Sequence, residues 1–142
     1  MKFKFFTGLI ILFIAFLLQF WLASMGWYTD LSYAALISFA FVFGFWELLV
    51  LDLIAVFVLN WQPGVSVLIL VFALYPIAIY FLRNILHWQV WLQDLCAIVV
   101  GFLVLYLSVV HGLPHVDAFL ADLAGGMLFG FLISSPLHRW GK

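Results

Sequence analysis

Long runs of apolar residues, separated by short polar or turn-forming stretches, make up nearly the whole chain. The first run covers residues 5–25, where Thr7 and Gln19 are mild interruptions, and later runs cover residues 31–59, 65–82, 89–110 and 118–137. A helix of about 20 apolar residues crosses the hydrocarbon core of a bilayer, which is about 30 Å thick. The pattern therefore predicts an all-α polytopic membrane protein, with one transmembrane helical domain over residues 1–142.

The run over residues 31–59 is too long for one upright helix. As a single helix it would be about 43 Å long, at about 1.5 Å per residue, against about 30 Å of hydrocarbon. One strongly tilted helix is a possible interpretation and gives five segments in all. Two short helices hinged near Gly44 are the alternative and give about six transmembrane segments.

The positions of the basic residues favour six segments. Lys and Arg occur only at positions 2, 4, 83, 139 and 142, and cytoplasmic loops are enriched in these two residue types. With six segments all these positions fall on one side of the membrane, whereas with five segments the last three oppose the first two. We therefore predict six segments, with segments two and three short, and both termini in the cytoplasm.

Composition agrees with a membrane protein. The chain is 69% hydrophobic and 8% charged, whereas a soluble domain has about 45–50% apolar and about 25% charged residues. No polar run is long enough for an aqueous domain. The formal net charge of −1 is not informative about nucleic acid, but no basic patch is present and no nucleic-acid partner is predicted. The single Cys96 cannot form an intrachain disulfide.

Three aspartates lie inside the predicted segments. Asp52 is near the middle of segment three, while Asp94 and Asp122 lie about two turns into segments five and six. A charge inside a membrane costs about 2.5–3.5 kcal/mol on insertion scales, and the chain has too few basic residues to pair each acid. At least Asp52 is therefore expected to be uncharged or hydrogen-bonded to a neighbouring helix. The interpretations are an interhelical hydrogen bond, a proton or ion path, a small-ligand pocket, or a partner contact.

Other motifs in the chain carry little chemistry. Gly126 and Gly130 form a GxxxG match, which lets another helix approach closely, either within the protein or in another molecule, including a second copy of the chain. His111 and His115 are four residues apart, but Pro114 separates them and neither lies in a segment, so no metal or cofactor is predicted. No catalytic motif is present, and we predict no enzyme activity.

Three short motifs follow one another between positions 47 and 108. They are Leu51-Asp52-Leu53-Ile54 in a short segment, Pro63-Gly64-Val65-Ser66-Val67-Leu68 at the start of the next, and Phe81-Leu82-Arg83-Asn84-Ile85-Leu86-His87-Trp88-Gln89. This succession resembles the bacterial rod shape-determining protein MreD family. The resemblance implies a non-enzymatic scaffold subunit of the rod-shape and cell-elongation machinery, which synthesises peptidoglycan. It also implies a single-span partner such as MreC, further elongation-complex proteins, and the bacterial inner membrane.

The family's fold is similar to that of the substrate-binding subunits of energy-coupling-factor vitamin transporters. A small-molecule-binding membrane subunit of a transporter is therefore the alternative function. A scaffold should have a packed apolar interior and a groove facing lipid, whereas a binding subunit should have a closed polar cavity near the outer face. The candidate lining residues of such a cavity are Trp88, Asp94, Tyr106 and Asp122.

The partner surface expected for a scaffold is the hairpin over residues 44–64 and the segments beside it. Short segments do not fill the bilayer thickness and leave a depression in which another helix can bury apolar side chains. Trp46 and Trp61 should flank this depression, and the turn at Pro63 and Gly64 should set its depth. The full set of candidate packing or partner-binding residues is Trp46, Asp52, Trp61, Pro63, Gly64, Arg83, Asn84, Gly126 and Gly130.

Overall fold

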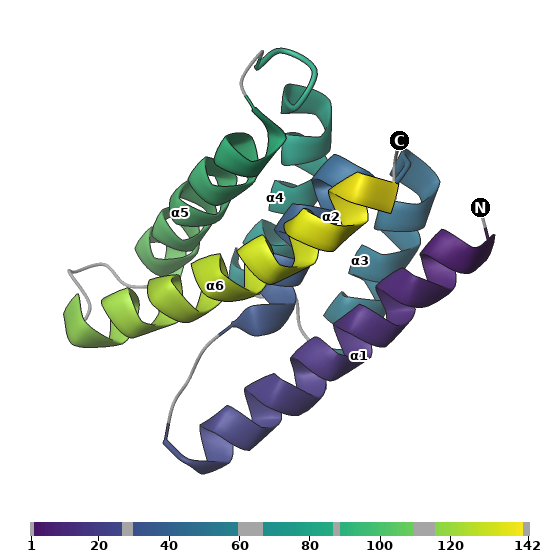
Figure 1. The fold of residues 1–142 in the computed structure, drawn as a ribbon. Helices are drawn as coiled ribbons and strands as arrows, with labels where there is room; N and C mark the ends of the chain where they lie inside the picture. The colour runs from purple at the N-terminus through teal and green to yellow at the C-terminus, as the bar shows by residue number, and fades with distance from the viewer. Residues whose placement is uncertain (1, 27–29, 60–66, 87–88, 110–115, 141–142) are drawn as a thin grey trace.

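The computed structural model describes residues 2–26, 30–59, 67–86, 89–109 and 116–140. This part of the chain contains six helices and no strand (Figure 1). The helices are α1 (Lys2–Ser24), α2 (Leu31–Val42), α3 (Phe45–Leu59), α4 (Val67–Leu82), α5 (Val90–Val109) and α6 (Val116–Trp140). The prediction of an all-α fold is confirmed, and the described part of the chain has six helices where six segments were predicted. Two helical stretches, Phe3–Ser24 and Val90–Leu107, are long and apolar enough to cross a membrane.

The apolar run over residues 31–59 is divided near Gly44, as predicted. Phe43 adopts an extended backbone, with φ −93° and ψ 160°, although its N–H still donates to the Phe39 carbonyl at 2.9 Å. On the other side of the break, the Glu47 carboxylate accepts the Gly44 N–H at 3.2 Å. An acid in the first turn suits the positive end of a helix dipole. The break therefore ends α2 and starts α3 with satisfied backbone groups.

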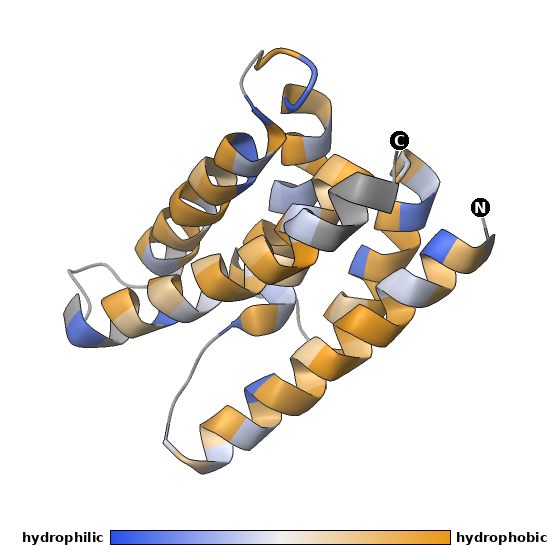
Figure 2. Cartoon of the chain, viewed as in Figure 1, coloured by the Kyte–Doolittle hydropathy of each residue, from blue (hydrophilic) through white to orange (hydrophobic). Residues whose placement is uncertain are grey.

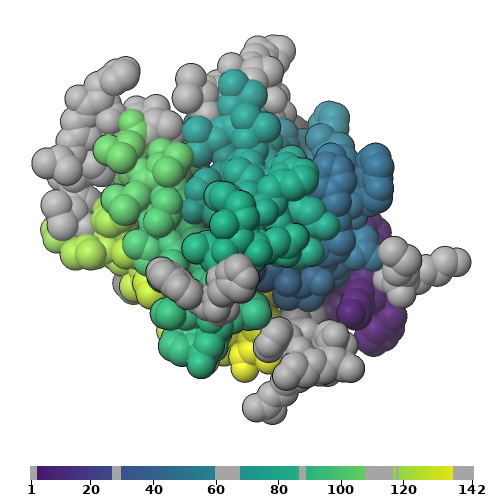
Figure 3. Space-filling model, turned by 90° about the horizontal axis from the view of Figure 1, so that it is seen from above, coloured from purple at the N-terminus to yellow at the C-terminus, as the bar shows by residue number. Residues whose placement is uncertain are grey.

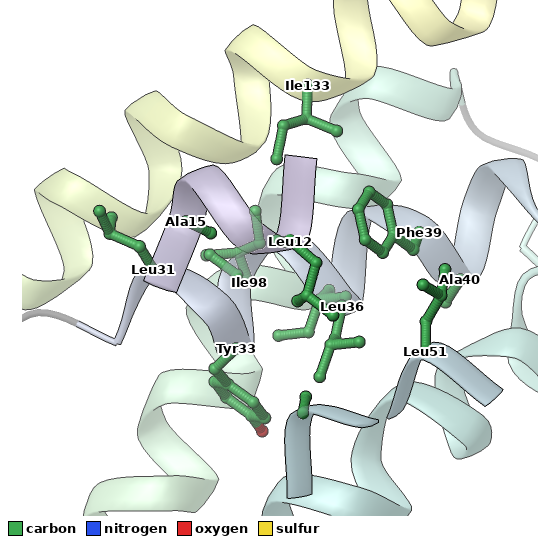
Figure 4. Close-up of a cluster of buried hydrophobic side chains, with 14 of the residues drawn as sticks. Leu12, Ala15, Leu31, Tyr33, Leu36, Phe39, Ala40, Leu51, Ile98 and Ile133 are labelled. Carbon is green, nitrogen blue, oxygen red and sulfur yellow. The ribbon is translucent and has the colours of Figure 1, made fainter. Parts of the chain in front are cut away.

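Helix α2 lies at the centre of the bundle, and α1, α3, α4, α5 and α6 all pack against it. Every residue from Leu31 to Ala40 is buried, as expected for a helix that is apolar on all sides. Figure 4 shows part of the resulting core, in which side chains of α2 meet side chains of four other helices. The labelled contributors from those helices are Leu12, Ala15, Leu51, Ile98 and Ile133.

The outer helices are hydrophobic along most of their length (Figure 2), and many of their large apolar side chains are exposed. Phe3, Phe57 and Leu107 are 72%, 78% and 68% exposed. Soluble monomers seldom expose contiguous apolar surface on this scale. A lipid environment covers such a surface, and helices satisfy their own backbone groups there.

The two ends of the bundle differ in charge. At one end, which we call the basic end, the first turns of α1 with Lys4 lie near the break between α2 and α3, where Gly8 packs against the Phe43 ring. Arg83, just after α4, reaches the same break, and its Nη1 donates to the carbonyl of Phe43 at 3.2 Å. The start of α1 and the end of α6 lie on this side in Figure 1. Lys4 and Arg83 therefore share one end.

Candidate functional site: the buried polar groups and the exposed face of α3

Asp94 anchors the polar cluster nearest the basic end. It is 0% exposed, and the Ser38 hydroxyl lies 3.1 Å from each of its carboxylate oxygens. Ser134 of α6 lies beside this carboxylate, and its hydroxyl donates to the Phe131 carbonyl at 3.3 Å. Because Asp94 belongs to α5 and Ser38 to α2, Asp94 forms the interhelical hydrogen bond that one interpretation of the sequence predicted.

Asp122 forms a second cluster at the opposite end. Its Oδ1 accepts the backbone N–H of Asp30 at 2.8 Å, and its Oδ2 accepts the Tyr106 hydroxyl at 2.6 Å. The cluster therefore joins α6 to α5 and to the residue before α2. Asp30 occupies the N-cap position of α2 but makes no side-chain cap bond.

The Asp30 carboxyl is half-buried beside this second cluster. Burial is the larger cause that raises its pKa, and the nearby Asp122 carboxylate adds to the effect, from an ordinary value of 3.8 to about 7. Both causes penalise the ionised form of Asp30, since neither offers the carboxylate a positive partner. Asp30 thus changes charge near neutral pH.

Asp52 is the isolated acid of the interior. It is 2% exposed on the inner face of α3, and its Oδ1 is buried without a hydrogen-bond partner among the described residues. The expectation of an interhelical hydrogen bond at Asp52 is therefore not met at this atom. A buried polar atom without a partner costs about 1–3 kcal/mol, so the contribution of Asp52 to stability is unfavourable at this atom.

The structure does not bring the predicted pocket residues together. Tyr106 and Asp122 bond to each other at one end of the bundle, while Asp94 bonds to Ser38 near the other. Along α5 the rise from Asp94 to Tyr106 is about 18 Å. Trp88 lies outside the described residues. Asp94, Tyr106 and Asp122 therefore line no common polar cavity in the described part of the chain.

The hollows that do occur are open and mainly apolar. One of about 190 Å³ has Asp30 as its charged residue and is otherwise lined by Val56, Leu59, Leu68, Ile69, Phe72 and Leu105. Two others lie along the seam between α4 and α5. None of these three is the closed polar cavity expected of a substrate-binding subunit.

Helix α3 presents an apolar stripe to the outside, which we call the α3 face. It consists of Trp46, Val50, Leu53 and Phe57, which are 75%, 41%, 49% and 78% exposed. Their spacing of four, three and four residues places them on one side of the helix. Helix α2, one of the segments beside the expected hairpin over residues 44–64, is buried from Leu31 to Ala40 and adds nothing there to the surface. Trp61, Pro63 and Gly64 lie outside the described residues.

The glycine stripe of α6 faces the inside of the bundle. A Cβ on Gly126 would lie 2.5 Å from the Phe102 ring, and one on Gly130 would overlap Ile98. Both glycines are buried, and they allow α5 to pack closely against α6. Of the two interpretations of the GxxxG match, internal packing is the one that the structure supports.

Arg83 was a candidate packing residue, and the structure shows which groups it contacts. Its Nη1 donates to the carbonyls of Ala40 at 2.7 Å and Phe43 at 3.2 Å, and its guanidinium lies 4.1 Å from the centre of the Tyr80 ring. A cation at these carbonyls stabilises the C-terminal end of α2. The next residue, Asn84, is exposed.

Small polar residues of α2 were also missed. Ser32 donates through its hydroxyl to the Gln19 side-chain oxygen of α1 at 2.8 Å, and Ser38 bonds to Asp94. The available signal was their position in a segment that is otherwise apolar on every side, since such residues inside a membrane helix often bond to a neighbouring helix.

No group of three or more His, Cys, Asp or Glu side chains in the described ranges can hold a metal ion. Comparison with protein-family models gave no match, and neither the curated proteins nor the solved structures gave a significant match. Function is therefore inferred from the chain's own motifs and geometry.

Proposed function

We propose that the chain is a multi-pass protein of the bacterial inner membrane, with both termini in the cytoplasm, and that it is a non-enzymatic scaffold. In this proposal it belongs to the rod-shape and cell-elongation machinery that synthesises peptidoglycan. It binds a single-span membrane partner such as MreC through the α3 face. The biological setting comes from the motifs that resemble the MreD family.

The observation that carries this proposal is the filled interior. Helix α2 occupies the centre, and every residue from Leu31 to Ala40 is buried. The polar groups that might have lined a cavity are engaged with one another, since Asp94 bonds to Ser38 and Asp122 bonds to Tyr106. A transporter subunit needs space for its ligand, so this interior favours a scaffold over the alternative function.

The shape of the α3 face supports a helical partner. Residues spaced by four and three along one side of a helix form the kind of seam that a second helix packs against. Phe57 and Trp46 are the most exposed members, at 78% and 75%. Trp46 stands at the start of α3, at the basic end, where an indole suits the membrane interface.

The membrane topology has independent support. Lys4 and Arg83 share one end of the bundle, as the cytoplasmic enrichment of basic residues requires for a protein with this many spans. The shortness of α2 does not contradict this topology. Because α2 is enclosed by other helices, its length does not have to equal the thickness of the hydrocarbon core.

Site-specific photocrosslinking in living cells tests the scaffold proposal. A photoreactive residue at Phe57 on the α3 face should capture a single-span protein of the elongation machinery. The matched control is Leu107, which is 68% exposed on α5, and this position should give no protein crosslink. Crosslinks of equal strength from both positions, or from neither, would contradict the assignment of the α3 face.

Reporter fusions test the topology separately. Fusions after residues 4, 86 and 142 should all report the cytoplasm, because the five basic residues lie on one side in the proposed arrangement. An external position for the fusion after residue 86 would restore the five-segment topology in the membrane.

A further inference from the structure

A groove follows the outer seam between α4 and α5. Two hollows form it, one of about 140 Å³ near the basic end and one of about 250 Å³ further along. Both are lined by Tyr75, whose hydroxyl donates to the Ala97 carbonyl of α5 at 2.7 Å. The hollows therefore lie next to each other along the seam, with Tyr75 between them, and together we call them the α4–α5 groove. Figure 3 looks onto this side of the molecule, where α4 (teal) lies between α3 (blue) and α5 (green).

The two parts of the α4–α5 groove differ in chemistry. The part near the basic end contains Arg83 and Gln93 among apolar residues that include Ile79, Ala97 and Val100. The other part is lined by Leu70, Val71, Leu74, Tyr75, Ala78 and Val104. The groove therefore has a cationic group at one end and an apolar wall along the rest of its length.

Arg83 lies at the basic end of the α4–α5 groove, and the described residues use only some of its N–H donors. Two of its five N–H groups, those on Nη1, are directed at the carbonyls of Ala40 and Phe43. The Nε–H and Nη2–H donors have no acceptor, and no carboxylate pairs with the guanidinium, among the residues that the structure describes. A guanidinium fork of this kind matches the geometry of a phosphate.

The length of the α4–α5 groove matches one lipid tail. Between Leu70 and Arg83 a helix rises by about 20 Å, while half of a hydrocarbon core is about 15 Å thick. The groove therefore reaches from the level of Arg83 past the middle of the hydrocarbon. Free phosphate cannot bury the apolar side chains that line the groove, whereas an acyl chain can.

We propose that the α4–α5 groove binds a phospholipid of the leaflet at the basic end. Its phosphate accepts hydrogen bonds from Nε and Nη2 of Arg83, and one acyl chain lies along the seam towards Leu70. The bound phosphate also holds the guanidinium against the last carbonyls of α2, so the lipid stabilises the break between α2 and α3. This inference goes beyond the scaffold proposal and requires only that the chain resides in a bilayer.

Cys96 provides a reporter for this site, because it is the single cysteine of the chain, it is exposed, and it lines the groove. The full chain, delipidated in a maltoside detergent, is treated with N-ethylmaleimide, and the alkylation rate of Cys96 is measured. Added phosphatidylglycerol should slow alkylation several-fold. Diacylglycerol, which has the tails without the phosphate, and inorganic phosphate should each have a much smaller effect.

Each of the other outcomes overturns the proposal. Equal protection by diacylglycerol would mean that Arg83 has no part in binding, and protection by inorganic phosphate would mean an anion site without a lipid. No protection by phosphatidylglycerol would mean that the groove is not a lipid site.

Two variants separate binding from folding. Arg83→Gln should abolish protection, but it also removes the cap of α2. Val100→Trp therefore serves as the second variant, because it fills the groove and leaves Arg83 intact; Val100 is 50% exposed. Its matched control is Leu107→Trp, on the same helix and outside the groove lining. Native mass spectrometry should find phosphatidylglycerol on the wild type and on Leu107→Trp, and lose it on Val100→Trp. Equal retention by the two tryptophan variants would overturn the proposal.

Discussion

Helices α2 and α3 are the two halves of one apolar run, yet they occupy opposite kinds of position. Every residue of α2 from Leu31 to Ala40 is buried, whereas α3 buries Leu48, Leu51, Asp52 and Ala55 and turns its α3 face outward. This difference in burial follows from the sizes of the side chains in the two helices. Helix α2 carries three alanines and two serines, and small residues let neighbouring helices approach on every side. Helix α3 carries a single alanine, on its inner face.

The largest expected effect comes from truncating one large side chain in each helix. Leu36→Ala in α2, at a position that is 0% exposed, should lower the free energy of unfolding by about 2–5 kcal/mol, because it leaves a cavity. Phe57→Ala on α3, at 78% exposure, should leave the stability of the isolated protein almost unchanged. Unfolding in detergent measures both. Similar losses for the two variants would remove the distinction between a central and a peripheral helix.

The close approach of α6 to α2 gives the next effect. A Cβ at Gly130 would overlap Ile98 and lie 3.2 Å from the Ser38 hydroxyl, so Gly130→Ala should cost about 1–3 kcal/mol through overpacking. The control is Gly44→Ala, whose Cβ would meet only the Glu47 carboxylate, at 3.8 Å. If the Gly44 variant is the more damaged in detergent unfolding, the break between α2 and α3 depends on glycine and the seam with α6 does not.

Asp52 distinguishes the inner face of α3 from its outer face. The sequence alone favours Asp52→Asn over Asp52→Leu, on the assumption of a hydrogen-bonded partner that leucine would leave unpaired. Since Oδ1 has no partner in the described structure, we expect the reverse, with Asp52→Leu more stable than Asp52→Asn by about 1 kcal/mol. Thermal unfolding in detergent compares them. A leucine variant that is less stable than the asparagine variant would restore the hydrogen-bonded interpretation.

A further expected effect is a dependence of stability on pH at the start of α2. The pKa of Asp30 is raised from 3.8 to about 7 in the folded protein, so between these values the folded state binds more protons than the unfolded state. Stability should therefore fall as pH rises through this window and level off above it. The groups that face Asp30 are the Asp122 carboxylate and, through it, Tyr106. Asp30→Asn should flatten the profile of melting temperature against pH, and an unchanged profile would assign the titration to another group.

The number of helices and the break at Gly44 were predictable, because they depend on local features. The apolar runs locate the segments, and the positions of the five basic residues favour six segments over five. The central place of α2 was not predictable in the same way. Hydropathy treats α2 and α3 alike, and only the packing of α1, α4, α5 and α6 around α2 separates them.

The polar groups were predictable one at a time but not as clusters. Asp94 and Asp122 stand out in any apolar segment, whereas their partners come from distant parts of the chain. Asp30 and Asp122 are 92 positions apart, and Ser38 and Asp94 are 56 apart. Arg83 was recognised as a topology signal, but its bond to the Ala40 carbonyl depends on how α4 crosses the end of α2, which no local pattern reveals.

The position of α2 has a consequence for how the protein is made. At about 18 Å, a helix of 12 residues is too short to span a bilayer by itself. Its most extensive contact is with α6, the last of the helices that the structure describes. If the chain is inserted in a membrane as proposed, α2 enters as half of a hairpin with α3. Its Ser38 is then not yet bonded to Asp94 of α5, and its most extensive contact forms only when α6 docks. Membrane proteases should accordingly degrade variants that lack α6. The hairpin of α2 and α3 is the segment that an insertase or chaperone is expected to bind during synthesis.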